Sequence, residues 1–120
     1  MYELRESPDS NIIEVMVDGS ISAAEYHEMA ERCLAFIEKH GKVRVLKEIV
    51  HFTGLDFQIF KDQLIYALLK HVNDVTATAV VTDEEWIVNL TNLLRPAYSY
   101  PVRCFNSSQL EEAREWLKSN

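Results

Sequence analysis

The side chains best suited to chemistry are histidines and cysteines, and their spacing does not match that of a catalytic or metal site. The histidines form no H-E-x-x-H pattern, and the cysteines, Cys33 and Cys104, lie far apart with no C-x-x-C pair. Zinc sites and disulfide frameworks normally show such short spacings. We therefore expect no metal site, no cofactor and two reduced thiols. The histidines are His27, His40, His51 and His71.

Two further polar positions have the chemistry of a site. Glu48 and His51 end a strand predicted over residues 43–50, where α/β proteins place ligands, and they could act as an acid–base pair. We favour the alternative of solvated loop-edge residues, because no third partner is evident. Thr53 precedes a predicted helix N-terminus, where a phosphate would be favoured, although a turn hydroxyl explains it more simply.

Composition excludes several functional classes. The chain has 12 Lys+Arg against 19 Asp+Glu, a net charge of −7, which argues against nucleic-acid binding. Its three glycines form no phosphate-cradling loop, and there is no G-x-S-x-G nucleophile turn. The N-terminal residues are polar, and no apolar run is long enough to span a bilayer. We therefore expect a cytoplasmic protein that is not an enzyme.

Two predicted helices, residues 57–71 and 84–95, are apolar well beyond one face. Such a helix is normally buried, or it contacts a partner, a ligand or lipid. One interpretation is a wide core face with scattered exposed apolar residues. The other is an apolar pocket or contact surface between the two helices. The residues that would line or gate this site are Phe57, Phe60, Leu64, Trp86, Leu90 and Leu94.

Alternating strands and helices position these residues in one domain, 1–120. Predicted strands cover residues 2–6, 11–19, 43–50, 76–81 and 101–105, and predicted helices cover 22–40, 57–71, 84–95 and 108 to the C-terminus. Capping boxes are predicted at Ser22, Thr82 and Ser108, and an N-cap at Asp56. This order predicts an α/β fold: a mixed, mostly parallel sheet with an N-terminal antiparallel hairpin and four helices.

Several segments along the chain form an ordered set. They are GKVRVL at 41–46, FTGLD at 52–56, AVVTD at 79–83, LLRP at 93–96 and LEEAREWL at 110–117, together with Trp86. As a set they resemble the bacterial SpoIIAA-like proteins of the STAS/SEC14 group, over residues 11–117. The resemblance implies the STAS-like fold, which is related in shape to the lipid-carrying CRAL-TRIO domain.

The resemblance also implies a binding or regulatory module. Anti-sigma factor antagonists of this group carry a phosphorylatable serine in an Asp-Ser-Ser-Gly-like segment, whereas the matching residues 52–57 contain no serine. The implied function is binding of an apolar small molecule or lipid, with peripheral membrane contact through 57–71 and 84–95. The alternative is a protein-interaction module of the antagonist type, binding a protein partner or a second copy through Thr53 and Asp56.

Overall fold

A five-stranded sheet in the order β1-β2-β3-β4-β5 forms the centre of the computed structural model, which describes residues 1–120. β1 pairs with β2 in the antiparallel direction, whereas β2 to β5 run parallel. The predicted mixed, mostly parallel sheet with an antiparallel N-terminal hairpin is confirmed. The strands are β1 (Tyr2–Glu6), β2 (Ile12–Ile21), β3 (Val43–Leu55), β4 (Val75–Thr82) and β5 (Val102–Phe105).

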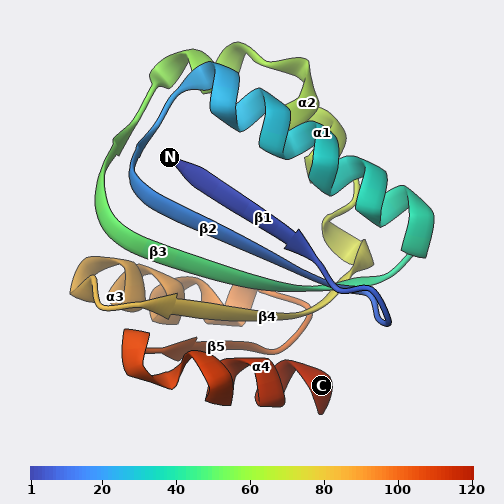
Figure 1. Ribbon diagram of the computed structural model, residues 1–120, viewed down its shortest axis with the longest axis vertical. Helices are drawn as coiled ribbons and strands as arrows, with labels where there is room; N and C mark the ends of the chain where they lie inside the picture. The colour runs from blue at the N-terminus through green and yellow to red at the C-terminus, as the bar shows by residue number, and fades with distance from the viewer.

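Four α-helices cover the two faces of the sheet unequally. They are α1 (Ala23–His40), α2 (Gln63–Leu69), α3 (Glu85–Leu94) and α4 (Leu110–Lys118). The first three connect neighbouring parallel strands, and right-handed crossovers that step toward one edge place all three on the same face. The fourth packs on the opposite face, against β3, β4 and β5. Figure 1 shows α1 and α2 together, with α3 apart from them beside β4.

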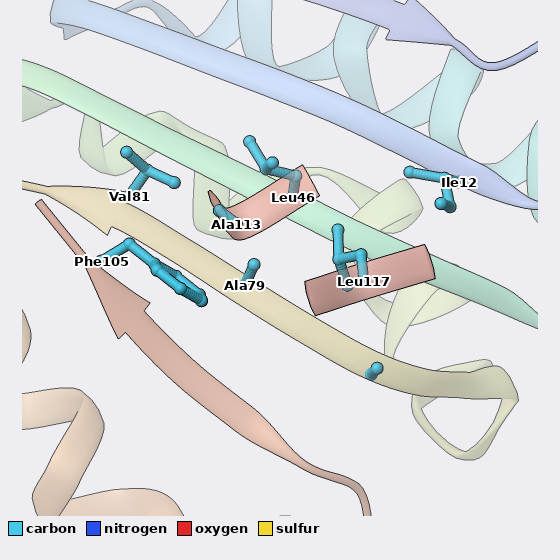
Figure 2. Packing of buried hydrophobic residues seen from close by; sticks show 8 residues of the cluster. Ile12, Leu46, Ala79, Val81, Phe105, Ala113 and Leu117 are labelled. Carbon is cyan, nitrogen blue, oxygen red and sulfur yellow. The ribbon is translucent and has the colours of Figure 1, made fainter. Parts of the chain in front are cut away.

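The layer under α4 is the most completely buried part of the core. Leu46 of β3, which is 1% exposed, lies with Ala79 and Val81 of β4 against Ala113 and Leu117 of α4, as Figure 2 shows. Side chains alternate between the faces along each strand, so Leu46 of β3 and Ala77, Ala79 and Val81 of β4 point to this layer. The small alanines let α4 approach the sheet closely.

The helix predicted over 57–71 is broken in two, and this part of the prediction is wrong. A 3₁₀ helix, η1 (Phe57–Lys61), ends at Asp62, which is extended with φ −78° and ψ 125°. The Asp62 carboxylate accepts a hydrogen bond from the N–H of Leu64 at 2.9 Å, so it acts as a new N-cap and restarts the helix as α2. The N-cap predicted at Asp56 is confirmed, since its carboxylate accepts from an early N–H of η1.

The strand predicted over 43–50 is longer in the structure: residues 51–55, expected to form a loop after it, are the last part of β3, which still pairs with β2 there. The register between the two strands shifts next to Gly19, which has a φ of 73°, and His51 on β3 has a φ of 45°. Glycine adopts positive φ without steric cost, so the strand pair bulges and continues. The turn-forming residues in this segment therefore mark an irregular strand and not its end.

Two of the three predicted capping boxes are wrong. Thr82 is the last residue of β4, and its hydroxyl accepts the N–H two residues later without forming a box. The box near α4 begins at Asn106 in place of Ser108, and it caps a short 3₁₀ turn that leads into the helix. The box at Ser22 is confirmed and begins α1.

The layer under α4 predicts a large difference between two leucine truncations. Leu46→Ala should lower the free energy of unfolding by about 2–5 kcal/mol, because it leaves a cavity in a buried core. Leu93→Ala, at a position that is 75% exposed, should change it by less than about 0.5 kcal/mol. Urea unfolding of both variants measures the two values. Similar values for the two variants would contradict this description of the core.

Candidate functional site

α3 carries an apolar flank that stays exposed to solvent. The inner face of the helix holds buried Ile87, whereas Trp86 (52% exposed), Leu90 and Leu94 recur at helical spacing beside it. The ring centroid of Trp86 lies 5.7 Å from that of Phe52 on β3. This flank of α3 therefore lies on the β3 side of the helix, toward α1 and α2.

A second exposed apolar group lies on η1 and α2. Phe57 is 79% exposed, and its ring centroid lies 6.3 Å from that of Phe60, which is also exposed. Leu64 is half-buried in α2, and Leu68 packs in the cluster under α1. The pockets at the sheet edges and beside α4 are lined by none of the six predicted ligand-binding residues. The role of these six residues in ligand binding therefore stays a prediction.

The sheet surface between these two groups is incompletely covered. Val15 of β2 and Val45, Lys47 and Ile49 of β3 point to the face that carries α1, α2 and α3. The three apolar residues are only half-buried and Lys47 is exposed, although they occupy inner strands. If α2 and α3 met above β3, they would bury these side chains. We call these four residues the open strip.

The open strip divides the apolar core of this face. Val45 packs in the cluster beneath α1 and α2, whereas Ile49 packs in the cluster beneath α3. Lys47 lies between them on the same face of β3, and its neighbour in the sheet, Val80 of β4, belongs to the α3 cluster. A charged residue thus stands where alternation calls for an apolar one that would join the two clusters.

The Lys47 ammonium has no acidic partner in the fold. Surrounding protein atoms lower its pKa by desolvation, and the one titratable side chain that acts on it is Cys33 of α1. Burial raises the pKa of Cys33 to about 11, so this thiol is neutral at neutral pH and gives no counter-charge. Lys47 is exposed to solvent, and the protein atoms around it still desolvate its ammonium, so the charge lies beside apolar neighbours and stays open to water.

Sequence reasoning missed Lys47, although a signal was present. In the strand predicted over 43–50, the apolar residues Val43, Val45 and Ile49 occupy one face, and Lys47 interrupts their alternation. An alternating strand that carries a lysine on its apolar face indicates either an edge or an uncovered patch. The order of the sheet places β3 in the middle, which leaves the uncovered patch.

The predicted pair at the end of β3 is brought into one surface hollow but is not bonded. Glu48 and His51 both line a hollow at the carboxyl ends of β3 and β4, with Asp83 and Ser107. The His51 side chain is 86% exposed, and its Nδ1 lies 3.7 Å from an oxygen of Asp18. No hydrogen bond joins Glu48 to His51, so the geometry favours solvated edge residues over an acid–base pair.

In the same hollow, Asp83 is held by its neighbour. Its carboxylate accepts from the N–H of Ser107 at 2.9 Å and from the Ser107 hydroxyl at 2.5 Å. These hydrogen bonds stabilise the charged form and lower the pKa of Asp83. They join the end of β4 to the turn before α4, which is a structural role.

Thr53 and Asp56, the predicted partner-binding residues, are both exposed near the end of β3. The Asp56 carboxylate accepts from the N–H of Gln58 at 2.9 Å, so it is engaged as an N-cap. Phe57 follows directly and points its ring into solvent. The segment is therefore accessible to a partner, and the partner contact itself stays a prediction.

An ion pair fixes the start of α2 against α1. His27 Nδ1 lies 2.5 Å from Asp62, and His27 Nε2 lies 2.9 Å from Glu31. The hydrogen bond to Asp62 is the main cause that raises the pKa of His27. The pKa of Asp62 is lowered, first by the N–H of Leu64 and then by His27. Asp62 thus caps α2 and ties it to α1 at the same time.

The fold and its relatives define the class of protein. The chain has the SpoIIAA-like α/β fold, and the SpoIIAA-like family model matches residues 12–118, so the chain belongs to the SpoIIAA-like family. No curated protein sequence matches. The wider grouping with SEC14 and CRAL-TRIO proteins stays a prediction.

Two solved structures share the fold. An uncharacterized protein of the DUF3478 family from Shewanella loihica PV-4, with a SpoIIAA-like fold, has a TM-score of 0.75 and 18% identity, covering 98% of this chain and 92% of that one. The phosphorylated form of the Bacillus cell fate determinant SpoIIAA has a TM-score of 0.58 and 11% identity, covering 97% and 98%. None of the helices is long and apolar enough to cross a membrane.

The ion pair predicts a pH-dependent contribution to stability. A raised histidine pKa stabilises the fold below the unfolded value of 6.5, and this contribution is lost as the pH rises through the folded pKa. His27→Gln should therefore lower the urea midpoint more at about pH 5.5 than at about pH 8.5. Asp62→Asn is the matched control, because it keeps an N-cap acceptor and removes the charge, and it should show the same pH trend. An equal His27→Gln effect at both pH values would contradict the pair.

Proposed function

We propose that the chain is a non-enzymatic binding module that holds an apolar or amphipathic small molecule over the open strip. The observation that carries this proposal is the incompletely covered centre of the sheet, where Val15, Val45 and Ile49 stay half-buried on the face that carries three helices. Apolar surface in such a position is stabilised when something covers it, by about 25 cal/mol for each Å² removed from water. Incompletely covered apolar side chains in the middle of a sheet, flanked by exposed apolar helices, are typical of a binding site.

The two exposed apolar groups supply the sides of this site. Trp86, Leu90 and Leu94 lie on the β3 side of α3, and Phe57 and Phe60 lie on η1. An aliphatic chain placed between α2 and α3 would contact the strip below and these side chains beside it. This arrangement has the apolar lining expected of a small-molecule site.

The same surface supports peripheral contact with a membrane only through apolar burial. The net charge of −7 works against binding to anionic lipid surfaces. The exposed side chains of Phe57, Leu69 and Leu93 offer apolar groups that could enter a neutral interface. We therefore propose a free amphiphile as the main ligand and a neutral membrane surface as the alternative.

A second candidate function is protein interaction of the anti-sigma antagonist type, without the usual serine. The exposed segment Thr53–Phe57 at the end of β3 favours it, because an accessible polar segment followed by an aromatic side chain suits a protein contact. The partner would be another protein or a second copy of this chain. A protein that contacts only the segment Thr53–Phe57 would leave the open strip exposed to solvent.

Fluorescence of Trp86 tests the proposed function. In a Trp116→Phe background, which keeps an aromatic ring against Phe105, addition of dodecanol or neutral phosphatidylcholine vesicles should move the Trp86 emission to the blue and saturate. The reason is that an apolar occupant removes water from a half-exposed indole. The matched control is Trp86→Phe with Trp116 present, which should show no shift. The absence of a change with dodecanol, dodecanoate and vesicles would reject the ligand site and favour the protein-interaction candidate.

A further inference from the structure

Lys47, the one charged member of the open strip, restricts what the site can hold. Its neighbours on the sheet are Val15, Val80 and the two apolar residues of β3 on the same face, Val45 and Ile49. None of these side chains can accept a hydrogen bond from an ammonium. A cation surrounded in this way is destabilised unless an anion or water satisfies it.

The helices above the strip supply no counter-ion. α1 contributes Cys33, whose pKa is raised to about 11 by burial, and Tyr26, whose pKa is also raised by burial. The carboxylate at the start of α2, Asp62, is already engaged by His27 and by its own helix. The side chains that α3 places toward β3 are apolar: Trp86, Leu90 and Leu94. The fold therefore leaves one positive charge at the floor of an otherwise apolar site.

We propose that Lys47 binds the carboxylate of a long-chain fatty acid whose aliphatic chain lies along the open strip. This inference rests on the proposed function and adds the charge of the ligand and its orientation. The ammonium donates to the carboxylate oxygens at the floor of the sheet, while the chain contacts the apolar flank of α3. Ion pairing in a site of reduced water content is stronger than at the surface, so the headgroup gains from the same environment that destabilises the free ammonium.

A carboxylate suits this site better than a phosphate. Phosphate groups are bound by several donors together, such as arginine forks or the N–H groups of a helix N-terminus. The open strip offers a single ammonium, since its other members are two valines and an isoleucine. The single ammonium of Lys47 therefore matches the single negative charge of a carboxylate. Lys47 lies on the middle strand, at the level of the sheet and below the helices on that face, which favours a free fatty acid over a lipid that remains in a bilayer, because the headgroup must leave the bilayer surface to reach the sheet.

Binding of dodecanoate and dodecanol to the same protein tests the proposal. Both ligands are used as monomers, with the Trp86 emission as the readout in the Trp116→Phe background. The wild-type lysine should favour dodecanoate by about tenfold, the factor that corresponds to one favourable charged hydrogen bond. Lys47→Met keeps the length of the side chain and removes the charge, and it should abolish this preference while dodecanol still binds. Lys47→Arg keeps a cation and should retain a preference for dodecanoate.

The outcomes separate the two levels of inference. If neither ligand binds the wild-type site, the proposed function itself fails. If both bind equally, or if Lys47→Met retains the preference for dodecanoate, the apolar site stands and the role of Lys47 is overturned. If dodecyl phosphate binds more tightly than dodecanoate and depends on Lys47, the assignment of a carboxylate is overturned. The urea midpoint of Lys47→Met, which should equal or exceed that of the parent protein, shows that the variant is folded.

Discussion

The constraint on which the structure depends is that every parallel crossover steps toward the same edge of the sheet. Strand order follows chain order, so α1, α2 and α3 must share one face. α2 has 7 residues and β3 has 13, so a helix of about 10 Å lies above a strand of about 43 Å. Such a short helix cannot cover its own strand. The exposed part of β3 is therefore a direct result of topology and element length.

The two faces of the sheet differ in how completely helices cover them. On the α4 side, alanines on β4 allow a close helix, and Arg114 of α4 donates two hydrogen bonds to Glu14 of β2 at 3.0 and 2.9 Å. That pairing raises the pKa of Arg114 and joins the C-terminal helix to a strand on the far side of β3. The α4 face thus holds the sheet together with a single helix. The opposite face can stay divided into two clusters, because the sheet is already stabilised from behind.

Local sequence signals predicted the elements well and their interruptions poorly. Strand alternation, the box at Ser22 and the cap at Asp56 are local features, and each is found in the structure. The apolar periodicity of 57–71 continues through Asp62, so a pattern of apolar spacing could not show that this aspartate restarts the helix. The capping box predicted at Ser108 is wrong because Asn106 is an equally good N-cap two residues earlier, and the local pattern does not choose between them.

The sequence predicted the exposed apolar residues on the helices of the candidate site, but not its residues on the sheet. The wide apolar surfaces of residues 57–71 and 84–95 drew attention to Phe57, Phe60 and Trp86, which are indeed exposed. Lys47 interrupts the apolar alternation of its strand, but this local signal fits an edge strand as well as an uncovered patch, and the position of the strand in the sheet decides between them. Only the sheet order and the burial of its neighbours show that this lysine lies in the middle of the sheet.

The two sides of the open strip belong to different parts of the core, which gives a ligand there more than a local effect. α2 is held to α1 by the His27–Asp62 pair and by Leu68. α3 is held to β4 and β5 through the cluster of Val80, Ile87 and Val102. The two clusters are joined through the backbone of the sheet, and Lys47 separates their side chains. A ligand that contacts both would stabilise each cluster by mass action, and its binding would couple the N-terminal and C-terminal halves of the domain.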